Sequence, residues 1–368
     1  MNEPVSLLEL AAPGVRGLQP YQPGKPLSEL QREYGIRDAV KLASNENPLG
    51  PGKLALAALR DGLAELGRYP DGNGFALKAA LAERHAVGAD QITLGNGSND
   101  VLEFVARVFL RPGREAIFSE HAFAVYPIVT QAVGATAVMT PAMDYGYDLQ
   151  AILDRINERT GVVFVANPNN PTGTWLAGAP LRAFLDQVPA HVAVVLDEAY
   201  FEYVQEPDYP DTTGWVRDYP NLVVTRTFSK AYGLAGLRVG YGISHPSVAD
   251  LFNRVRQPFN VNALAQTAAE AALSDTEHLL ESVRINREGM SQLTEAFERL
   301  GLDWIPSVAN FVSVDMGRPA GALYEGLLRE GVIVRPIAGY GLPNHLRATI
   351  GLPEENARLI AALERVLA

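Results

Sequence analysis

The hydrophobic positions between residues 75 and 245 follow two alternating periods. Residues 75–87 have helical spacing, and Ser98 and Asn99 can cap a second helix whose apolar residues recur on one face. Strand signals are short apolar or β-rich runs bounded by Pro, Gly or Asp, and they lie at 91–94, 162–166, 192–196 and 222–227. The alternation predicts an α/β domain whose central sheet is mostly parallel and flanked by helices.

The remaining chain predicts an arm and a second, smaller unit. Residues 1–40 are rich in Pro and Gly, with a short helical stretch near 27–34. A long helical region is expected over 262–300. The segments after it have strand or helix signals, in chain order at 310–314, 320–330, 332–335, 345–350 and 354–367. We therefore predict an N-terminal arm (1–40) that packs with the small domain and active site, a large domain (41–255) and a small α+β domain with its connecting helix (256–368).

Composition excludes several classes of function. The 368 residues have a net charge of −11, which disfavours nucleic acids and anionic membranes as partners. No cysteine and only six histidines are present, so disulfides, thiol nucleophiles and His- or Cys-ligated metals are not expected. Glu3 and Glu9 precede the first arginine, unlike a signal peptide, and no run of about 18 apolar residues occurs. A cytoplasmic location is predicted.

Polar clusters follow the predicted strands, where open α/β sheets bind ligands. Asn170 begins an Asn-Pro-Thr-Gly segment, which in isolation is an ordinary turn. Asp197 can form an ion pair with a cationic ring nitrogen, bind a metal, act as a base or simply cap a helix. Lys230 can be a surface charge or a cleft amine that forms a Schiff base. Ser229 and Arg238 beside it suit a phosphate group.

A further anion site is indicated where Gly97 precedes Ser98 and Asn99, because the free N–H groups of a helix start bind anions. Asp100 stands where a GxGxxG motif needs its last glycine, so a nicotinamide-binding domain is poorly supported. Together the clusters require a ligand with a phosphate, a protonated ring nitrogen and a carbonyl. Pyridoxal 5′-phosphate has all three.

These motifs resemble the fold-type I, class I and II aminotransferases, and most closely the histidinol-phosphate aminotransferases. The resemblance runs through nearly the whole chain in order. Besides Asn170-Pro-Thr-Gly, Asp197-Glu-Ala-Tyr200 and Ser229-Lys230 with Arg238, it rests on Leu18-Gln-Pro-Tyr21-Gln-Pro-Gly-Lys-Pro, Lys41-Leu-Ala-Ser-Asn45-Glu-Asn-Pro-Leu-Gly-Pro51, Arg68-Tyr69-Pro70, Asn310-Phe311 and His345-Leu-Arg347-Ala-Thr-Ile-Gly351.

The resemblance implies how the chain holds its cofactor. Lys230 would form the Schiff base, and Asp197 would pair with the pyridine nitrogen. Asn170 and Tyr200 would bond the phenolic oxygen, and Phe123 would stack on the ring. The phosphate would be held by Ser98, Asn99, Ser229 and Arg238, together with Tyr69 of a partner subunit, so the resemblance also implies a homodimer with shared active sites.

For the substrate, the resemblance implies that Arg347 and Asn45 bind the α-carboxylate, while Arg335 and Tyr21 favour a substrate phosphate. The implied reaction converts L-histidinol phosphate and 2-oxoglutarate to imidazole-acetol phosphate and L-glutamate in histidine biosynthesis. The chain departs from the family at Ser98-Asn99-Asp100, where bacterial members often carry Ala-Asp-Glu. The backbone donors are kept there.

Three alternatives stay open from the sequence. An aromatic amino-acid aminotransferase acting on phenylalanine or tyrosine needs a similar ring pocket. A pyridoxal-phosphate lyase or decarboxylase would use Lys230 and Asp197 in the same roles but would break a different bond of the substrate. A regulatory or scaffold protein could keep the fold without catalysis, and failure to bind pyridoxal phosphate would favour it.

Overall fold

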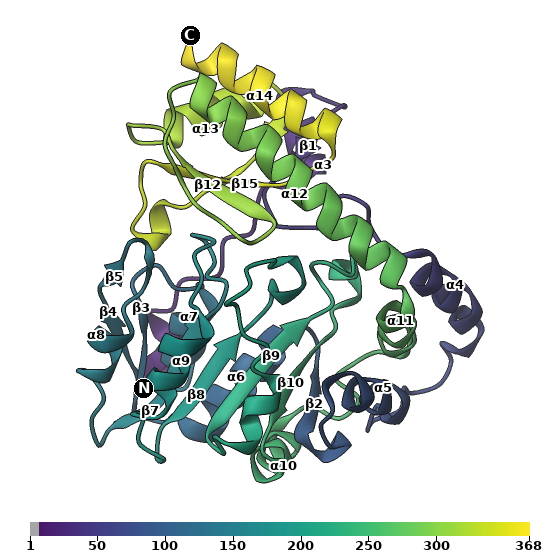
Figure 1. Cartoon of the computed structure of the whole chain (residues 1–368), viewed down its shortest axis with the longest axis vertical. Helices are drawn as coiled ribbons and strands as arrows, with labels where there is room; N and C mark the ends of the chain where they lie inside the picture. Colours follow the sequence, from purple (N-terminus) through teal and green to yellow (C-terminus); the bar gives the residue numbers. More distant parts are fainter. Residues whose placement is uncertain (1–6) are drawn as a thin grey trace, which may run out of the picture.

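A seven-stranded sheet forms the centre of the larger part of the chain (Figure 1). The computed structural model describes residues 7–368. The strands run in the order β4-β3-β7-β8-β9-β10-β2, and only β10 is antiparallel to its neighbours. Their bounds are β2 (Ile92–Gly95), β3 (Glu115–Ser119), β4 (Thr136–Thr140), β7 (Thr160–Ala166), β8 (Ala193–Asp197), β9 (Leu222–Thr227) and β10 (Gly240–Ser244). Every residue of β7, β8 and β9 is buried, as their continuous apolar runs predict.

Helices flank this sheet, and their apolar faces complete its core. They are α4 (Lys53–Gly62), α5 (Phe75–His85), α6 (Ser98–Phe109), α7 (Val125–Ala132), α8 (Leu149–Leu153), α9 (Gly178–Leu185), α10 (Pro246–Val255) and α11 (Ala263–Ser274). A small hairpin of β5 (Ala142–Met143) and β6 (Gly146–Tyr147) lies beyond β4. The α/β class with a mostly parallel central sheet is confirmed.

A second hydrophobic core surrounds a four-stranded antiparallel sheet. Its order is β11 (Trp304–Ile305), β12 (Phe311–Asp315), β15 (His345–Thr349) and β14 (Arg335–Pro336). The helices α12 (Thr276–Arg299), α13 (Gly321–Arg329) and α14 (Pro353–Leu367) pack around it, and Figure 1 shows α12 bridging the two parts. A separate parallel pair, β1 (Val40–Lys41) with β13 (Val332–Ile333), ties the segment after the arm to this smaller part.

Local structure departs from the sequence prediction at three places. The helical region expected over 262–300 is two helices, because Asp275 ends α11 and its carboxylate caps the start of α12. The strand expected at 332–335 is split into β13 and β14, which belong to different sheets. Ser98 does not cap α6 but begins it, and the cap position is Gly97, whose φ of 83° favours glycine.

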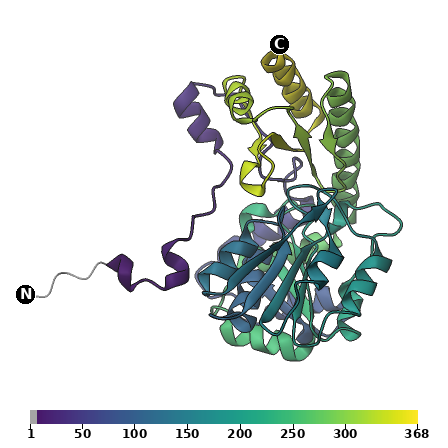
Figure 2. The same ribbon diagram turned by 90° about the vertical axis from the view of Figure 1, so that its left-hand side faces the viewer.

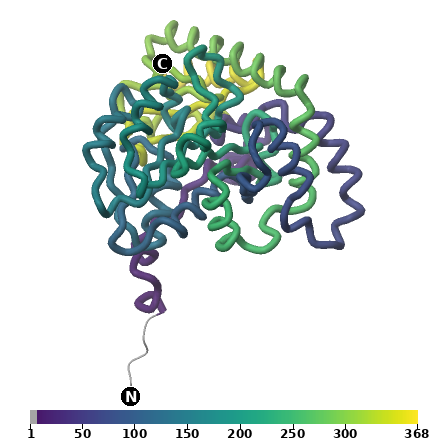
Figure 3. The backbone as a smooth tube through the Cα atoms, turned by 60° about the horizontal axis from the view of Figure 1, so that its bottom comes forward, coloured from purple at the N-terminus to yellow at the C-terminus, as the bar shows by residue number. Residues whose placement is uncertain are grey.

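The first described residues of the N-terminal arm project from the body (Figures 2 and 3), whereas the helix over Leu27–Tyr34 packs on the smaller part of the chain through the buried Leu30. The arm contains α1 (Leu7–Leu10), α2 (Pro13–Arg16) and α3 (Leu27–Tyr34), and α2 touches α7. Residues 1–6, including Glu3, lie outside the described residues. No helix within residues 7–368 is long and apolar enough to cross a bilayer.

Candidate active site

A cavity of about 190 Å³ lies at the carboxyl ends of β7, β8 and β9, facing the smaller part of the chain. Twelve of the fourteen site residues expected from the sequence line it. They are Tyr21, Asn45, Ser98, Asn99, Phe123, Asn170, Asp197, Tyr200, Ser229, Lys230, Arg238 and Arg347. Strand ends and a helix start thus bring together residues spread over more than 300 positions, as ligand binding in open α/β sheets requires.

Lys230 lies three residues after the end of β9 and lines this cavity. Its Nζ donates to the carbonyl oxygen of Ser44 at 3.1 Å. Burial, together with the nearby guanidinium of Arg347, lowers the pKa of Lys230 to about 7. A large share of this amine is therefore neutral at neutral pH, which is the form that attacks carbonyls and accepts protons.

Asp197 ends β8, and its side chain is buried at the floor of the cavity. The Tyr126 hydroxyl donates to one carboxylate oxygen at 2.8 Å, and the Thr225 hydroxyl donates to the other at 2.9 Å. Burial raises the pKa of Asp197, whereas these hydrogen bonds oppose the rise. The arrangement presents a hydrogen-bonded carboxylate that can pair with a buried cationic nitrogen.

One end of the cavity has the features of an anion site. The first turn of α6 places backbone N–H groups there, beside Ser229 and Arg238, whose side chains are 3.3 Å apart. A Cβ at Gly97 would lie 2.5 Å from the Arg238 guanidinium, so only glycine permits this approach. Hydroxyl, guanidinium and helix start converge as a phosphate group requires.

The cavity is also lined by a buried guanidinium, that of Arg347. Arg347 on β15 donates to the side-chain oxygen of Asn170 and, at 2.9 Å, to the carbonyl oxygen of Ala43. Its Nε has no partner in the described structure and is buried. Asn45, at a positive φ of 56°, donates to the Tyr200 hydroxyl at 2.9 Å. Burial raises the pKa of Tyr200 to about 12, although Arg347 acts against this rise.

Two expected residues do not line the cavity. Arg335 lies next to it, with its guanidinium 5.5 Å from the centre of the Tyr21 ring and a hydrogen bond to the Gln22 carbonyl. Tyr69 is 82% exposed and stacks on Phe259, with the ring centroids 4.8 Å apart. Tyr69 therefore lies on the surface, outside the cavity of its own chain.

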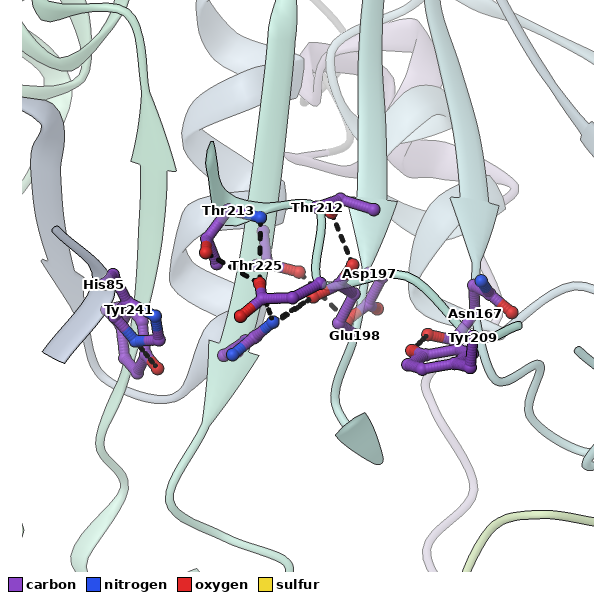
Figure 4. A network of polar contacts seen from close by, with 11 residues as sticks. His85, Asn167, Asp197, Glu198, Tyr209, Thr212, Thr213, Thr225 and Tyr241 are labelled. Atoms are coloured by element: carbon purple, nitrogen blue, oxygen red, sulfur yellow. Dashed lines mark hydrogen bonds and ion pairs between the residues drawn. The ribbon is translucent and has the colours of Figure 1, made fainter. Parts of the chain in front are cut away.

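Sequence reasoning missed a buried polar network next to Asp197 (Figure 4). Arg226 donates to Glu198 at 2.7 and 3.0 Å and to Asp211 at 2.8 Å, and Arg226 and Glu198 are almost inaccessible to water. Thr212 donates to the other carboxylate oxygen of Glu198. The β8–β9 register pairs Asp197 with Thr225, so alternation puts the next residues, Glu198 and Arg226, on the other side of the sheet. Only known strand pairing could have revealed this ion pair.

Comparison with known proteins identifies the class. The model of the aminotransferase class I and II family matches residues 37–363. The chain therefore belongs to the class I and II aminotransferases, and the resemblance noted in its motifs is confirmed.

Within residues 7–368, no group of three or more acidic or histidine side chains is placed to hold a metal ion.

The more similar relatives have a single activity in their names. Histidinol-phosphate aminotransferase 2 of Pseudomonas fluorescens is 65% identical over 363 residues, with 98% of both chains covered. Histidinol-phosphate aminotransferase 1 of Nitrosococcus oceani is 61% identical, covering 98% of this chain and 97% of the relative. A solved histidinol-phosphate aminotransferase from Sinorhizobium meliloti, in complex with pyridoxal-5′-phosphate, superimposes with a TM-score of 0.89 at 30% identity, covering 96% of each chain.

Proposed function

We propose that this protein is a pyridoxal-phosphate-dependent histidinol-phosphate aminotransferase. It would convert L-histidinol phosphate and 2-oxoglutarate to imidazole-acetol phosphate and L-glutamate. One observation carries the proposal furthest: the Lys230 amine, with a pKa near 7, shares a cavity with the buried Asp197 carboxylate and an anion site. Relatives at 57–65% identity over nearly the full chain support the choice of substrate.

The residues present fit pyridoxal phosphate by their own chemistry. The phosphate would lie at the start of α6 with Ser229 and Arg238, and the pyridine nitrogen would face Asp197. Asn170 and Tyr200 would bond the phenolic oxygen, and Phe123 would cover the ring. When bound, the cofactor supplies an aldehyde for an amine and a ring that withdraws electrons from the substrate carbon.

Lys230 would then have two tasks. Its neutral Nζ would hold the cofactor through the aldehyde group and would give up that position to the amine of a substrate. Freed Lys230 would carry the proton from the substrate carbon to the cofactor carbon C4′, as base and then as acid. Asp197 would pair with the ring nitrogen and favour its protonated form, because two hydroxyl donors favour the carboxylate and oppose the rise of the Asp197 pKa that burial causes. The anchored phosphate makes this transfer effectively intramolecular.

Two guanidinium groups would select the substrates. Arg347, with its unpartnered Nε in the cavity wall and Asn45 beside it, would bind the carboxylate of glutamate or 2-oxoglutarate. Arg335 and Tyr21 would bind the phosphate of histidinol phosphate. Because both substrates are anions, the same positive wall can accept each in turn.

We further propose a homodimer with shared active sites, in which Tyr69 contacts the phosphate of the partner's cofactor. Large apolar side chains are exposed along one stretch and at Phe259: Leu54, Leu56, Leu63, Leu66, Tyr69, Phe75 and Phe259. So many exposed apolar residues in a short stretch are typical of a protein interface.

We also propose a cytoplasmic location for the enzyme. The lack of cysteines suits the reducing cytoplasm, and so do small-molecule substrates.

The proposal is tested by product analysis. Purified protein with pyridoxal phosphate, L-histidinol phosphate and 2-oxoglutarate is expected to form L-glutamate in proportion to the donor consumed. Glutamate formed with phenylalanine or tyrosine but not with histidinol phosphate would move the substrate to the aromatic alternative. Ammonia released from histidinol phosphate without glutamate would indicate a lyase, and carbon dioxide released from phenylalanine or tyrosine without glutamate would indicate a decarboxylase. Failure to bind pyridoxal phosphate at all would favour a non-catalytic protein.

A further inference from the structure

Tyr126 is a buried tyrosine that neither the motifs nor the cavity lining single out. It lies on α7, fully inaccessible to water, and its hydroxyl donates to Oδ2 of Asp197 at 2.8 Å. Its ring stacks on Phe164 of β7, with centroids 4.8 Å apart and planes within 6°. This stacking fixes the direction of the hydroxyl, because a ring packed flat against the sheet has little freedom to turn.

The carboxylate of Asp197 is held from two elements. Tyr126 of α7 bonds one oxygen, and Thr225 of β9 bonds the other at 2.9 Å. The Ala199 backbone N–H also donates to this carboxylate, and the other groups that act electrostatically on Asp197 are the Lys230 amine and the Tyr147 and Tyr200 hydroxyls. Hydrogen bonds that a carboxylate accepts favour its charged form, whereas its burial favours the neutral one. The Tyr126 bond is thus one of few influences that keep this buried acid ionised.

Tyr126 also touches the aromatic wall of the cavity. Its ring meets the Phe123 ring edge to face, with centroids 5.9 Å apart and planes at 88°. Phe123 lines the cavity, so one side chain contacts both the acid at the floor and the aromatic residue at the side. A shift of Tyr126 would move both of these groups relative to the bound ring.

We propose that Tyr126 is a positioning residue that fixes the Asp197 carboxylate and the Phe123 ring and keeps Asp197 ionised for the ring nitrogen of the cofactor. The part concerning the ring rests on the proposed function. The part concerning Asp197 does not, because the hydrogen bond is present in the protein without any ligand. The two parts can therefore be tested separately.

The direct experiment is carbon-13 NMR of the cofactor-free protein labelled at the aspartate carboxyl carbon, titrated with acid. Asp197→Asn identifies the signal. In Tyr126→Phe we expect the Asp197 titration midpoint to rise by about one pKa unit, a tenfold gain in proton affinity, because the anion loses a donor. With pyridoxal phosphate added, the same variant is expected to lose cofactor affinity at a higher pH than the unmodified protein.

Tyr147→Phe is the matched control. Tyr147 is an equally buried tyrosine, but its oxygen contacts the Ala166 N–H and not Asp197. An equal shift in Tyr147→Phe, or no shift in Tyr126→Phe, would overturn the proposal. If Tyr126→Phe does not fold, 3-fluorotyrosine placed at position 126 keeps the fold and makes the hydroxyl a stronger donor. It is expected to lower the Asp197 midpoint, and an unchanged midpoint would again overturn the proposal.

Discussion

Lys230 illustrates how burial changes the chemistry of a single residue. A lysine in water is almost fully charged at neutral pH, but desolvation and the charge of Arg347 bring the pKa of Lys230 to about 7. The same Arg347 that would bind the substrate carboxylate therefore also activates the lysine. A substrate carboxylate on Arg347 would weaken this repulsion, so ligand binding and the protonation of Lys230 are coupled.

This shifted pKa predicts how the cofactor-free protein captures pyridoxal phosphate. Only the neutral amine attacks, so the second-order rate of capture is expected to rise from pH 6 to about pH 8 and then to level off. Stopped-flow absorbance measures this rate. A rate that keeps rising steadily toward pH 10 would mean that Lys230 has the pKa of an ordinary lysine.

Arg335 predicts a split between substrates. Arg335→Ala should reduce kcat/KM for histidinol phosphate by about tenfold to a hundredfold, the equivalent of one lost charge-assisted hydrogen bond to phosphate. Activity with phenylalanine, which has no phosphate, should change little. Arg299→Ala, which removes an exposed arginine from the end of α12, is the control for loss of charge. Equal losses with both substrates would refute the phosphate role of Arg335.

At the scale of elements, side-chain hydrogen bonds connect the ends of β8 and β9 on both sides of the sheet. Thr225 bonds Asp197 on one side, and Arg226 bonds Glu198 on the other. Arg226→Met should lower the melting temperature strongly, because it leaves Glu198 buried without its cation, at a cost of about 3–5 kcal/mol. The double variant Arg226→Met, Glu198→Leu should recover part of this loss. Differential scanning calorimetry measures the melting temperatures of both variants. An Arg226→Met variant as stable as the parent would contradict a stabilising role of the Arg226–Glu198 ion pair.

The sequence predicts those elements well whose signals are local. The sequence correctly predicts β7, β8 and β9 from their apolar runs and the start of α14 from Pro353. Burial and helix starts each require particular residue types at adjacent positions, so their signals can be seen locally. The division of 262–300 was missed although Asp275 is a preferred N-cap residue, because helical signals continue on both sides of it. β10 was also missed, since a short strand with two glycines resembles a loop.

The residues of the candidate site also fall into two groups, those that local sequence signals predict and those that only tertiary contacts define. Residues such as Asp197, Lys230 and Arg238 follow strands or belong to motifs, so they could be named from the sequence, and the cavity contains them. Tyr126 and Arg226 could not be named. Tyr126 is one apolar-face residue of a short helix without a recognisable motif, and the partner of Arg226 is defined only by strand pairing. Contacts between distant segments depend on tertiary structure, which local patterns do not encode.

At the scale of the whole molecule, the proposed homodimer would complete each active site with the exposed Tyr69 of the partner subunit. Lys230→Ala and Tyr69→Ala should each be inactive or nearly so when pure. When the two variants are unfolded together and refolded, half of the dimers should be mixed, each with one intact site, which gives about a quarter of the parent activity. No recovery would contradict shared sites, provided that gel filtration shows dimers. A monomer by gel filtration would contradict the dimer itself.

The central claim is that the Lys230 and Asp197 cavity serves transamination of histidinol phosphate. Its most direct test is the visible absorption of the pyridoxal-phosphate-loaded protein during titration with L-histidinol phosphate in the absence of 2-oxoglutarate. We expect a yellow band that bleaches at low donor concentration and returns when 2-oxoglutarate is added. A yellow band that only phenylalanine or tyrosine bleaches would contradict the substrate, and no band at all would contradict the claim itself.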